Sequence, residues 1–209
     1  GALKIKYILG PYMGTQMYFE AIRSFLRSQG VKSEEEIVSL KYRAGEWPGY
    51  LQIELKNGRV LKAEKFYYNY LIPFFITDSS LQLVDFTNEL CDISVGDAWH
   101  PKYEKQGKGF SVMLSRSKKG EELLQEMREK ELLSLEELPL EEALEMHSHM
   151  LDFKKRGSFI RNSWKKVKPN YGYYPAKIPV SRHLVEYVLA AIFYTAKTKP
   201  AYITPGSST

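Results

Sequence analysis

The sequence has 209 residues, of which 44% are hydrophobic, so the chain is long enough to bury a core. Its net charge of +5 is modest, no signal peptide opens it, and no run of about 18 apolar residues marks a membrane span. Cys91 is the only cysteine, which excludes an internal disulfide and favours a reducing, cytoplasmic setting.

The first half of the sequence predicts several strands and one helix. Short runs in which polar and apolar residues alternate indicate strands, and these runs are Lys4–Leu9, Ile37–Tyr42, Tyr50–Leu55 and Arg59–Ala63. Apolar residues at helical spacing predict a helix from Thr15 to about Gln29. Asn57-Gly58 is typical of a tight hairpin turn between the last two strands. The aromatic block Phe66–Phe75 fits either a buried helix or a strand.

The second half predicts two more strands followed by helices. The strands are Ile93–Val95 and Phe110–Leu114, and the helices are Gly120–Lys130, a segment from Leu138-Pro139 onward, and Ser181–Thr195. These elements predict an α+β fold with a mixed sheet, a central Asn-Gly hairpin, packed helices and a helical C-terminal extension. We expect a domain over 1–150 and a basic, aromatic extension over 151–209.

Two segments carry more than generic patterning. The first is Tyr42-Arg43-Ala44-Gly45-Glu46-Trp47-Pro48-Gly49, and the second runs from Asp85-Phe86-Thr87-Asn88 to Val95-Gly96-Asp97-Ala98-Trp99. With Gly107–Ser111 and its strand in the expected order, they resemble the C-terminal domain of the coenzyme F420 hydrogenase/dehydrogenase beta-subunit family. The resemblance covers roughly Ile5 to Lys130.

The resemblance implies a flavin-linked protein. Family members bind FAD and an iron–sulfur cluster, and they pass electrons between a hydride carrier, often the deazaflavin F420, and a partner's redox centre. In longer relatives another domain precedes the segment that Lys4–Leu9 resembles. We therefore expect a flavin or deazaflavin coenzyme as ligand, and an N-terminal partner domain or another redox subunit as partner.

The cluster ligands of the family are missing from this sequence. Ser80 and Leu83 stand at the positions of the usual C-x-x-C pair, and Pro11-Tyr12-Met13, at another ligand position, contains no cysteine. Because clusters need thiolates, the sequence predicts that the iron–sulfur cluster is absent. Cys91 is expected to be a small buried residue.

Six residues in the two segments are candidate cofactor-binding residues, namely Arg43, Trp47, Gly49, Gly96, Asp97 and Trp99. Arg43 and Trp47 flank a glycine-rich bend and fit contacts with a phosphate or a ring, or they join two strands. Gly96 ends a strand where a backbone can approach a ligand, or it permits a turn that Asp97 caps. Trp99 either stacks on a ring system or fills the core.

Other polar clusters carry weaker signals. The acidic residues Asp85, Glu89, Asp92 and Asp97 match no cation loop, and His147 and His149 face different sides of a helix, so no metal site is predicted. His100, next to Trp99, is placed for proton transfer near a flavin. No nucleophilic triad, phosphate loop or dinucleotide-binding glycine fingerprint appears.

The C-terminal part raises two questions about partners. The basic run Lys154–Lys168 matches no nucleic-acid motif, so it is interpreted as a solvated face and nucleic acid is not an expected partner. The apolar side of the last helix is expected to pack on the domain or a partner, with peripheral membrane contact as the less favoured alternative.

Two functions remain open from the sequence. One is an FAD-dependent oxidoreductase or electron-transfer component, and the other is a non-catalytic interaction or assembly module of the same fold. An open cleft at Gly96, Asp97 and Trp99 favours the first, and a filled surface favours the second.

Overall fold

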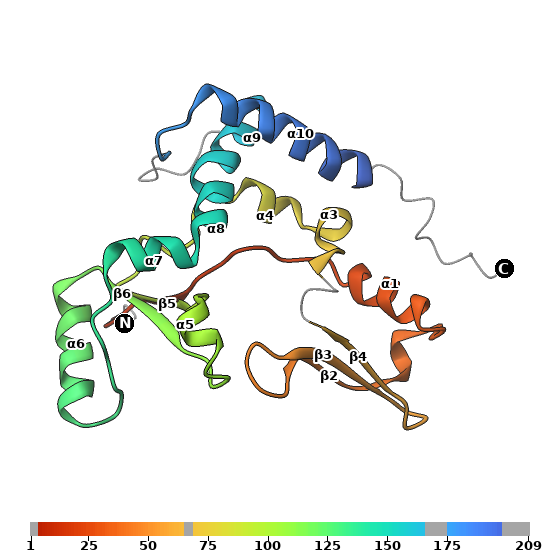
Figure 1. The fold of residues 1–209 in the computed structure, drawn as a ribbon, viewed down its shortest axis with the longest axis horizontal. Helices are drawn as coiled ribbons and strands as arrows, with labels where there is room; N and C mark the ends of the chain where they lie inside the picture. The colour runs from red at the N-terminus through yellow and green to blue at the C-terminus, as the bar shows by residue number, and fades with distance from the viewer. Residues whose placement is uncertain (1–3, 65–68, 166–174, 198–209) are drawn as a thin grey trace. The chain divides into compact units, whose positions relative to one another are not determined.

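A computed structural model describes residues 4–64, 69–165 and 175–197, which form two compact units (Figure 1). Among the described residues, unit 1 comprises 4–14, 83–159 and 175–176. Unit 2 comprises 15–64, 69–82, 160–165 and 177–197. The division of the chain at residue 150 stays a prediction.

Unit 2 contains an antiparallel sheet built on the predicted hairpin. Its strands are β2 (Ile37–Ala44), β3 (Tyr50–Leu55) and β4 (Val60–Glu64), in the order β2-β3-β4. Gly58 adopts φ +82°, which the tight turn requires and which glycine tolerates without strain. Alternation places Leu51, Ile53 and Leu55 on the buried face of β3.

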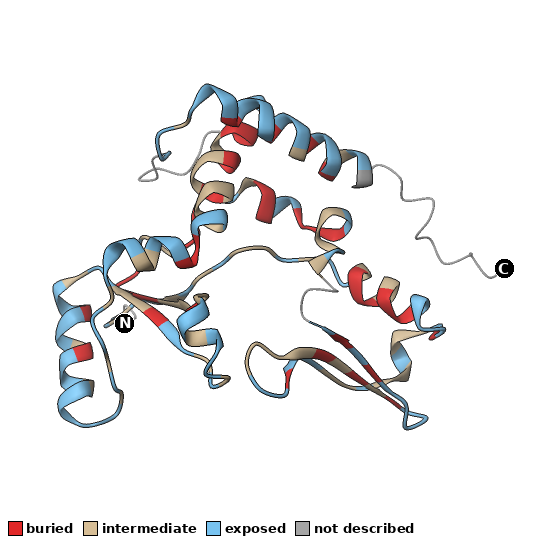
Figure 2. Ribbon diagram, viewed as in Figure 1, coloured by how far each residue is buried: buried red, intermediate tan, exposed pale blue. Residues whose placement is uncertain are grey.

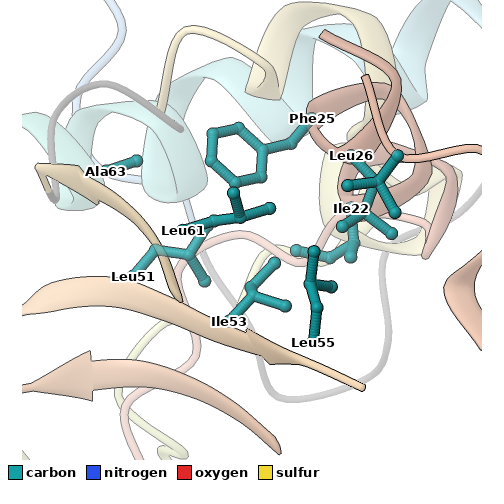
Figure 3. Packing of buried hydrophobic residues seen from close by; sticks show 9 residues of the cluster. Ile22, Phe25, Leu26, Leu51, Ile53, Leu55, Leu61 and Ala63 are labelled. Atoms are coloured by element: carbon teal, nitrogen blue, oxygen red, sulfur yellow. The ribbon is translucent and has the colours of Figure 1, made fainter. Parts of the chain in front are cut away.

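The core of unit 2 lies between this sheet and helix α1 (Glu20–Ser28). Ile22, Phe25 and Leu26 point from the helix toward the apolar side chains of β3 and β4 (Figure 3). A short 3-10 helix, η1 (Glu34–Glu36), leads into β2 and is capped by the Ser33 side chain.

Among the described residues, four further helices contribute to unit 2, and two of them are joined by buried charges. The helices are α3 (Ile72–Phe75), α4 (Asp78–Gln82), α9 (Phe159–Trp164, in unit 2 from Ile160) and α10 (Val180–Lys197). Glu186 of α10 is fully buried, accepts a hydrogen bond from Arg161 of α9, and forms an ion pair with Arg182 at 2.8 Å. Arg161 also donates to the Leu81 carbonyl at 2.7 Å, so one side chain links α9, α10 and the end of α4.

Unit 1 contains the mixed sheet. Strand β5 (Ile93–Asp97) lies at the centre, parallel to β1 (Leu9–Pro11) and antiparallel to β6 (Ser111–Ser115). Its helical elements are α5 (Pro101–Glu104), α6 (Lys118–Glu129), α7 (Leu140–Met146), α8 (Ser148–Asp152) and the π-helical turn η2 (Phe153–Ser158).

The α+β class, the hairpin and the C-terminal helix are confirmed, but the predicted single sheet is two sheets. The hairpin belongs to the antiparallel sheet, and the mixed sheet lies in the other unit. Among the described residues, no helix is both long enough and apolar enough to cross a membrane.

Two predicted elements begin later than expected, because tertiary hydrogen bonds hold the preceding backbone. The first strand starts at Leu9, since the Ile8 N–H donates to the Asp92 carboxylate. The first helix starts at Glu20, since Gln16 and Tyr18 donate to Ser80 and to the Phe75 carbonyl. Part of the block Phe66–Phe75 lies outside the described residues, and its end forms α3.

Candidate functional site

In unit 2, the candidate residues Arg43, Trp47 and Gly49 lie on the loop that joins β2 to β3. Gly45 and Gly49 adopt φ +77° and +80°, in the region that favours glycine. A Cβ on Gly49 would lie 3.1 Å from both the Ala44 carbonyl oxygen and the Arg43 Cα. The loop therefore closes tightly on the end of β2, and Gly49 has a structural role in that closure.

This closure places a cation over an aromatic ring. The guanidinium carbon of Arg43 lies 4.8 Å from the centre of the Trp47 ring, and Arg43 is exposed while Trp47 is half-buried. A second pair lies on the adjoining strands, where the Lys62 ammonium is 5.0 Å from the centre of the Tyr50 ring. Two cations and two aromatic faces thus gather at one end of the antiparallel sheet, a combination that suits a phosphate joined to a ring system.

In unit 1, the candidate residues Gly96, Asp97 and Trp99 lie at the end of β5, and the surface of Gly96 is occupied by an aromatic ring. A Cβ on Gly96 would lie 2.2 Å from Cδ2 of Tyr12. The Tyr12 ring therefore occupies the place beside the Gly96 main chain where the sequence suggested a ligand. Asp97 and Trp99 are half-buried.

Tyr12 belongs to a cluster of three rings that the sequence did not single out. Tyr12, Phe86 and His147 have ring centroids 5.2 Å apart in each of the three pairs. The His147 imidazole hydrogen-bonds the main-chain carbonyl of Asp97, and its buried Nε2 has no hydrogen-bond partner among the described residues. Burial lowers the pKa of His147 and raises the pKa of Tyr12 to about 12. Both rings are therefore neutral near pH 7.

We expect this cluster to make unit 1 sensitive to acid. The native state keeps His147 neutral below the ordinary pKa of 6.5, whereas the unfolded state takes up a proton there. The free energy of unfolding should therefore fall as the pH drops below 6.5. An NMR titration measures the pKa of the His147 imidazole, on which this loss of stability depends. His147→Gln, which lacks the imidazole, is the control. An imidazole pKa at or above 6.5 would contradict the prediction.

Asp85 and Asp92 of the second segment accept hydrogen bonds from main-chain N–H groups and so have structural roles. Asp92 accepts hydrogen bonds from Ser117 at 2.6 Å, Lys119 at 2.9 Å and the Ile8 N–H at 2.8 Å, and these hold its pKa at about 2. Asp85 accepts from the Glu89 N–H at 3.0 Å. In the part of the chain that the structure describes, no group of three or more acidic, histidine or cysteine side chains is arranged to hold a metal ion.

The residues at the positions where the resemblance implies cluster ligands do not fit an iron–sulfur cluster. Ser80 is buried in unit 2, where its hydroxyl accepts from the Gln16 N–H at 2.8 Å and from Thr77 Oγ1 at 2.9 Å. Leu83 offers no ligand atom. Cys91, the single cysteine, is buried in unit 1 with its thiol 3.1 Å from the Ile93 carbonyl oxygen. One thiolate cannot hold a cluster.

Several side chains of the basic run Lys154–Lys168 are buried or ion-paired, unlike those of a solvated face. Lys154 and Arg161 are fully buried, and Lys155 forms an ion pair with Glu89. The interpretation as a solvated face is therefore wrong for these residues, since helix η2–α9 turns them inward. Lys165 is exposed, and residues 166–168 of the run lie outside the described residues. His100 caps α5 by accepting from the Lys102 N–H at 3.3 Å.

The two sheets and their helices define an α+β protein. Residues 1–141 match the family model that describes the C terminus of the beta subunit in coenzyme F420 hydrogenase/dehydrogenase. The chain therefore belongs to this family. A search of curated proteins finds no match.

Among solved structures, the chain is similar to one in the F420-reducing NiFe hydrogenase complex from Methanosarcina barkeri, studied by xenon derivatization. The sequence identity is 13% and the TM-score is 0.49. The match covers 83% of this chain and 55% of that chain, so this chain spans about half the length of the other.

Proposed function

We propose that the chain is a flavin-linked electron-transfer domain that binds FAD without an iron–sulfur cluster. The observation that carries the proposal is the Arg43–Trp47 pair, in a segment that resembles a family signature. The substrate side of the proposal is a hydride carrier such as the deazaflavin F420. An N-terminal domain or another redox subunit is the proposed partner, in a cytoplasmic setting.

The residues present fit the chemistry of FAD. Arg43 and Lys62 supply positive charge for a pyrophosphate, and Arg43 has the planar donor geometry that phosphate oxygens prefer. Trp47 and Tyr50 supply ring faces for a flat heterocycle, although each already faces a cation. When bound, FAD supplies hydride and single-electron transfer. The protein's part is to bind and orient it.

We expect Arg43→Gln and Trp47→Leu each to weaken FAD binding about tenfold, the effect of losing one well-placed contact. Titration of FAD followed by the protein's tryptophan fluorescence or by calorimetry measures this affinity. Lys56→Gln is the matched control, because it removes one exposed positive charge from the hairpin of the same sheet. FAD affinity that is unchanged in both variants would contradict the proposed site.

A second function is favoured by one observation at the end of β5. The Tyr12 ring fills the surface at Gly96, the arrangement expected of a non-catalytic interaction module. FAD titration separates the two functions. Binding that Arg43→Gln weakens favours the flavin-linked domain, whereas an interaction module should not bind FAD.

A further inference from the structure

Helix α10 is mostly exposed along its length, with buried positions at intervals (Figure 2). Among its described side chains, the charged Arg182 and Glu186 are buried and six large apolar ones are exposed. The buried row is formed, at helical spacing, by Arg182, Glu186, Ala190 and Phe193. The opposite side is largely apolar, and its large exposed hydrophobic residues are Val180, Leu184, Val185, Tyr187, Val188 and Ile192. We call these six residues the α10 face. Leu184, near its centre, is 70% exposed. A surface helix of a globular protein normally buries its apolar side and exposes its charged residues. The exposed α10 face is therefore expected to bind another apolar surface.

The charges of the helix argue against a lipid surface as that cover. From Val180 to Thr195 the only acidic or basic residues, histidine apart, are Arg182 and Glu186, and both are buried. Helices that lie on membranes carry lysine or arginine beside the apolar side, where they meet anionic headgroups. The α10 face has none, and an uncharged face is suited to another uncharged apolar protein surface.

The α10 face is complementary to itself when the helix direction is reversed. A two-fold axis at the level of residue 186 pairs Leu184 with Val188 of a second copy, and Val180 with Ile192. Val185 and Tyr187 lie on opposite edges of the face, about 160° apart around the helix, so they flank this central contact. Since neither copy brings a charge to the face, no like charges meet across it. This is the pattern of an isologous dimer interface, in which one patch serves both copies.

We propose that the α10 face is the interface of a homodimer in which two copies of α10 pack antiparallel. The six residues together expose on the order of 700 Å², which is the upper limit of what they can bury, against the roughly 800 Å² per partner of a standard interface. Trp164 lies beside the face, since its ring contacts Tyr187 edge-on at 6.2 Å, and it extends the apolar surface. The proposal is independent of flavin binding.

Size-exclusion chromatography with light scattering tests the proposal on the full chain over a range of concentrations. The unmodified chain should have twice the monomer mass. Leu184→Glu should be a monomer at concentrations where the unmodified chain is a dimer, corresponding to a dissociation constant raised at least 100-fold. Leu140→Glu is the matched control, because Leu140 of α7 is also 70% exposed and lies on another helix. It should remain a dimer.

Circular dichroism verifies that Leu184→Glu remains folded, as expected for an exposed position. A second variant, Leu184→Cys with Val188→Cys, should form a disulfide-linked dimer under mild oxidation, because an axis at residue 186 brings Leu184 of one copy opposite Val188 of the other. The proposal is overturned if the unmodified chain stays monomeric. This includes the outcome in which the monomer binds anionic lipid vesicles and Leu184→Glu abolishes that binding. A dimer that Leu184→Glu leaves intact also overturns it.

Discussion

Glu186→Ala should lower the free energy of unfolding by about 3–5 kcal/mol, the usual effect of removing one partner from a buried ion pair. Glu186 is 0% exposed and is the carboxylate that both Arg161 and Arg182 contact. Arg161 is 1% exposed, and burial already lowers the pKa of its guanidinium. Without the carboxylate, a buried cation loses its counter-charge while it keeps its bond to the Leu81 carbonyl.

Urea denaturation followed by far-UV circular dichroism measures this loss. Glu126→Ala is the matched control, because Glu126 of α6 pairs with Lys130 at the surface, where solvent screens the pair. We expect no measurable shift of its midpoint. Equal midpoints for the two variants would contradict a structural role for the buried network.

Gly96→Ala should destabilise unit 1 by about 3 kcal/mol, at the upper end for overpacking. The added Cβ would lie 2.2 Å from Cδ2 and 2.5 Å from Cγ of Tyr12, closer than real Cβ contacts. The ring cannot move aside freely, because it packs against Phe86 and His147. Either β5 must shift or the three-ring cluster must open.

A double variant shows whether the clash with Tyr12 is the cause. Tyr12→Leu removes the ring, so adding it to Gly96→Ala should restore part of the lost stability rather than lower it further. Near-UV circular dichroism during denaturation follows the packing of the aromatic side chains. Strictly additive effects of the two substitutions would show that the added methyl group acts elsewhere.

The elements predicted well from the sequence are those fixed by local chemistry. Strands β3 and β4 follow from alternation on either side of Asn57-Gly58, and their pairing needs only a short turn. Helix α6 follows from Leu123, Leu124 and Met127 at helical spacing. In these segments the local pattern and the tertiary packing agree.

The sequence did not predict the features that depend on distant pairs. The bounds of strand β1 are Leu9–Pro11 instead of the predicted Lys4–Leu9, because they are set by its pairing with β5, more than eighty residues later. The cluster of Tyr12, Phe86 and His147 joins three separate segments, and no spacing rule connects them. One signal was available for Tyr12, because the resemblance implies a cluster-ligand position within Pro11-Tyr12-Met13.

Helix α10 shows why the side that a helix buries within its own domain could not be predicted, while packing of its apolar side on a partner stays a prediction. Its apolar side was expected to pack on the domain or a partner, because amphipathic helices normally bury that side. Within the described chain the helix turns the other way, since Glu186 and Arg182 engage Arg161. A buried ion network therefore sets the orientation against the apolar pattern.

The absorbance spectrum of the purified protein tests the central claim most directly. It is recorded after FAD has been added in excess and free FAD removed by gel filtration, with Arg43→Gln treated in parallel. We predict a retained flavin band without the broad iron–sulfur shoulder, and a weaker band in the variant. A colourless protein, or a band that Arg43→Gln leaves unchanged, would contradict flavin binding at the Arg43–Trp47 pair.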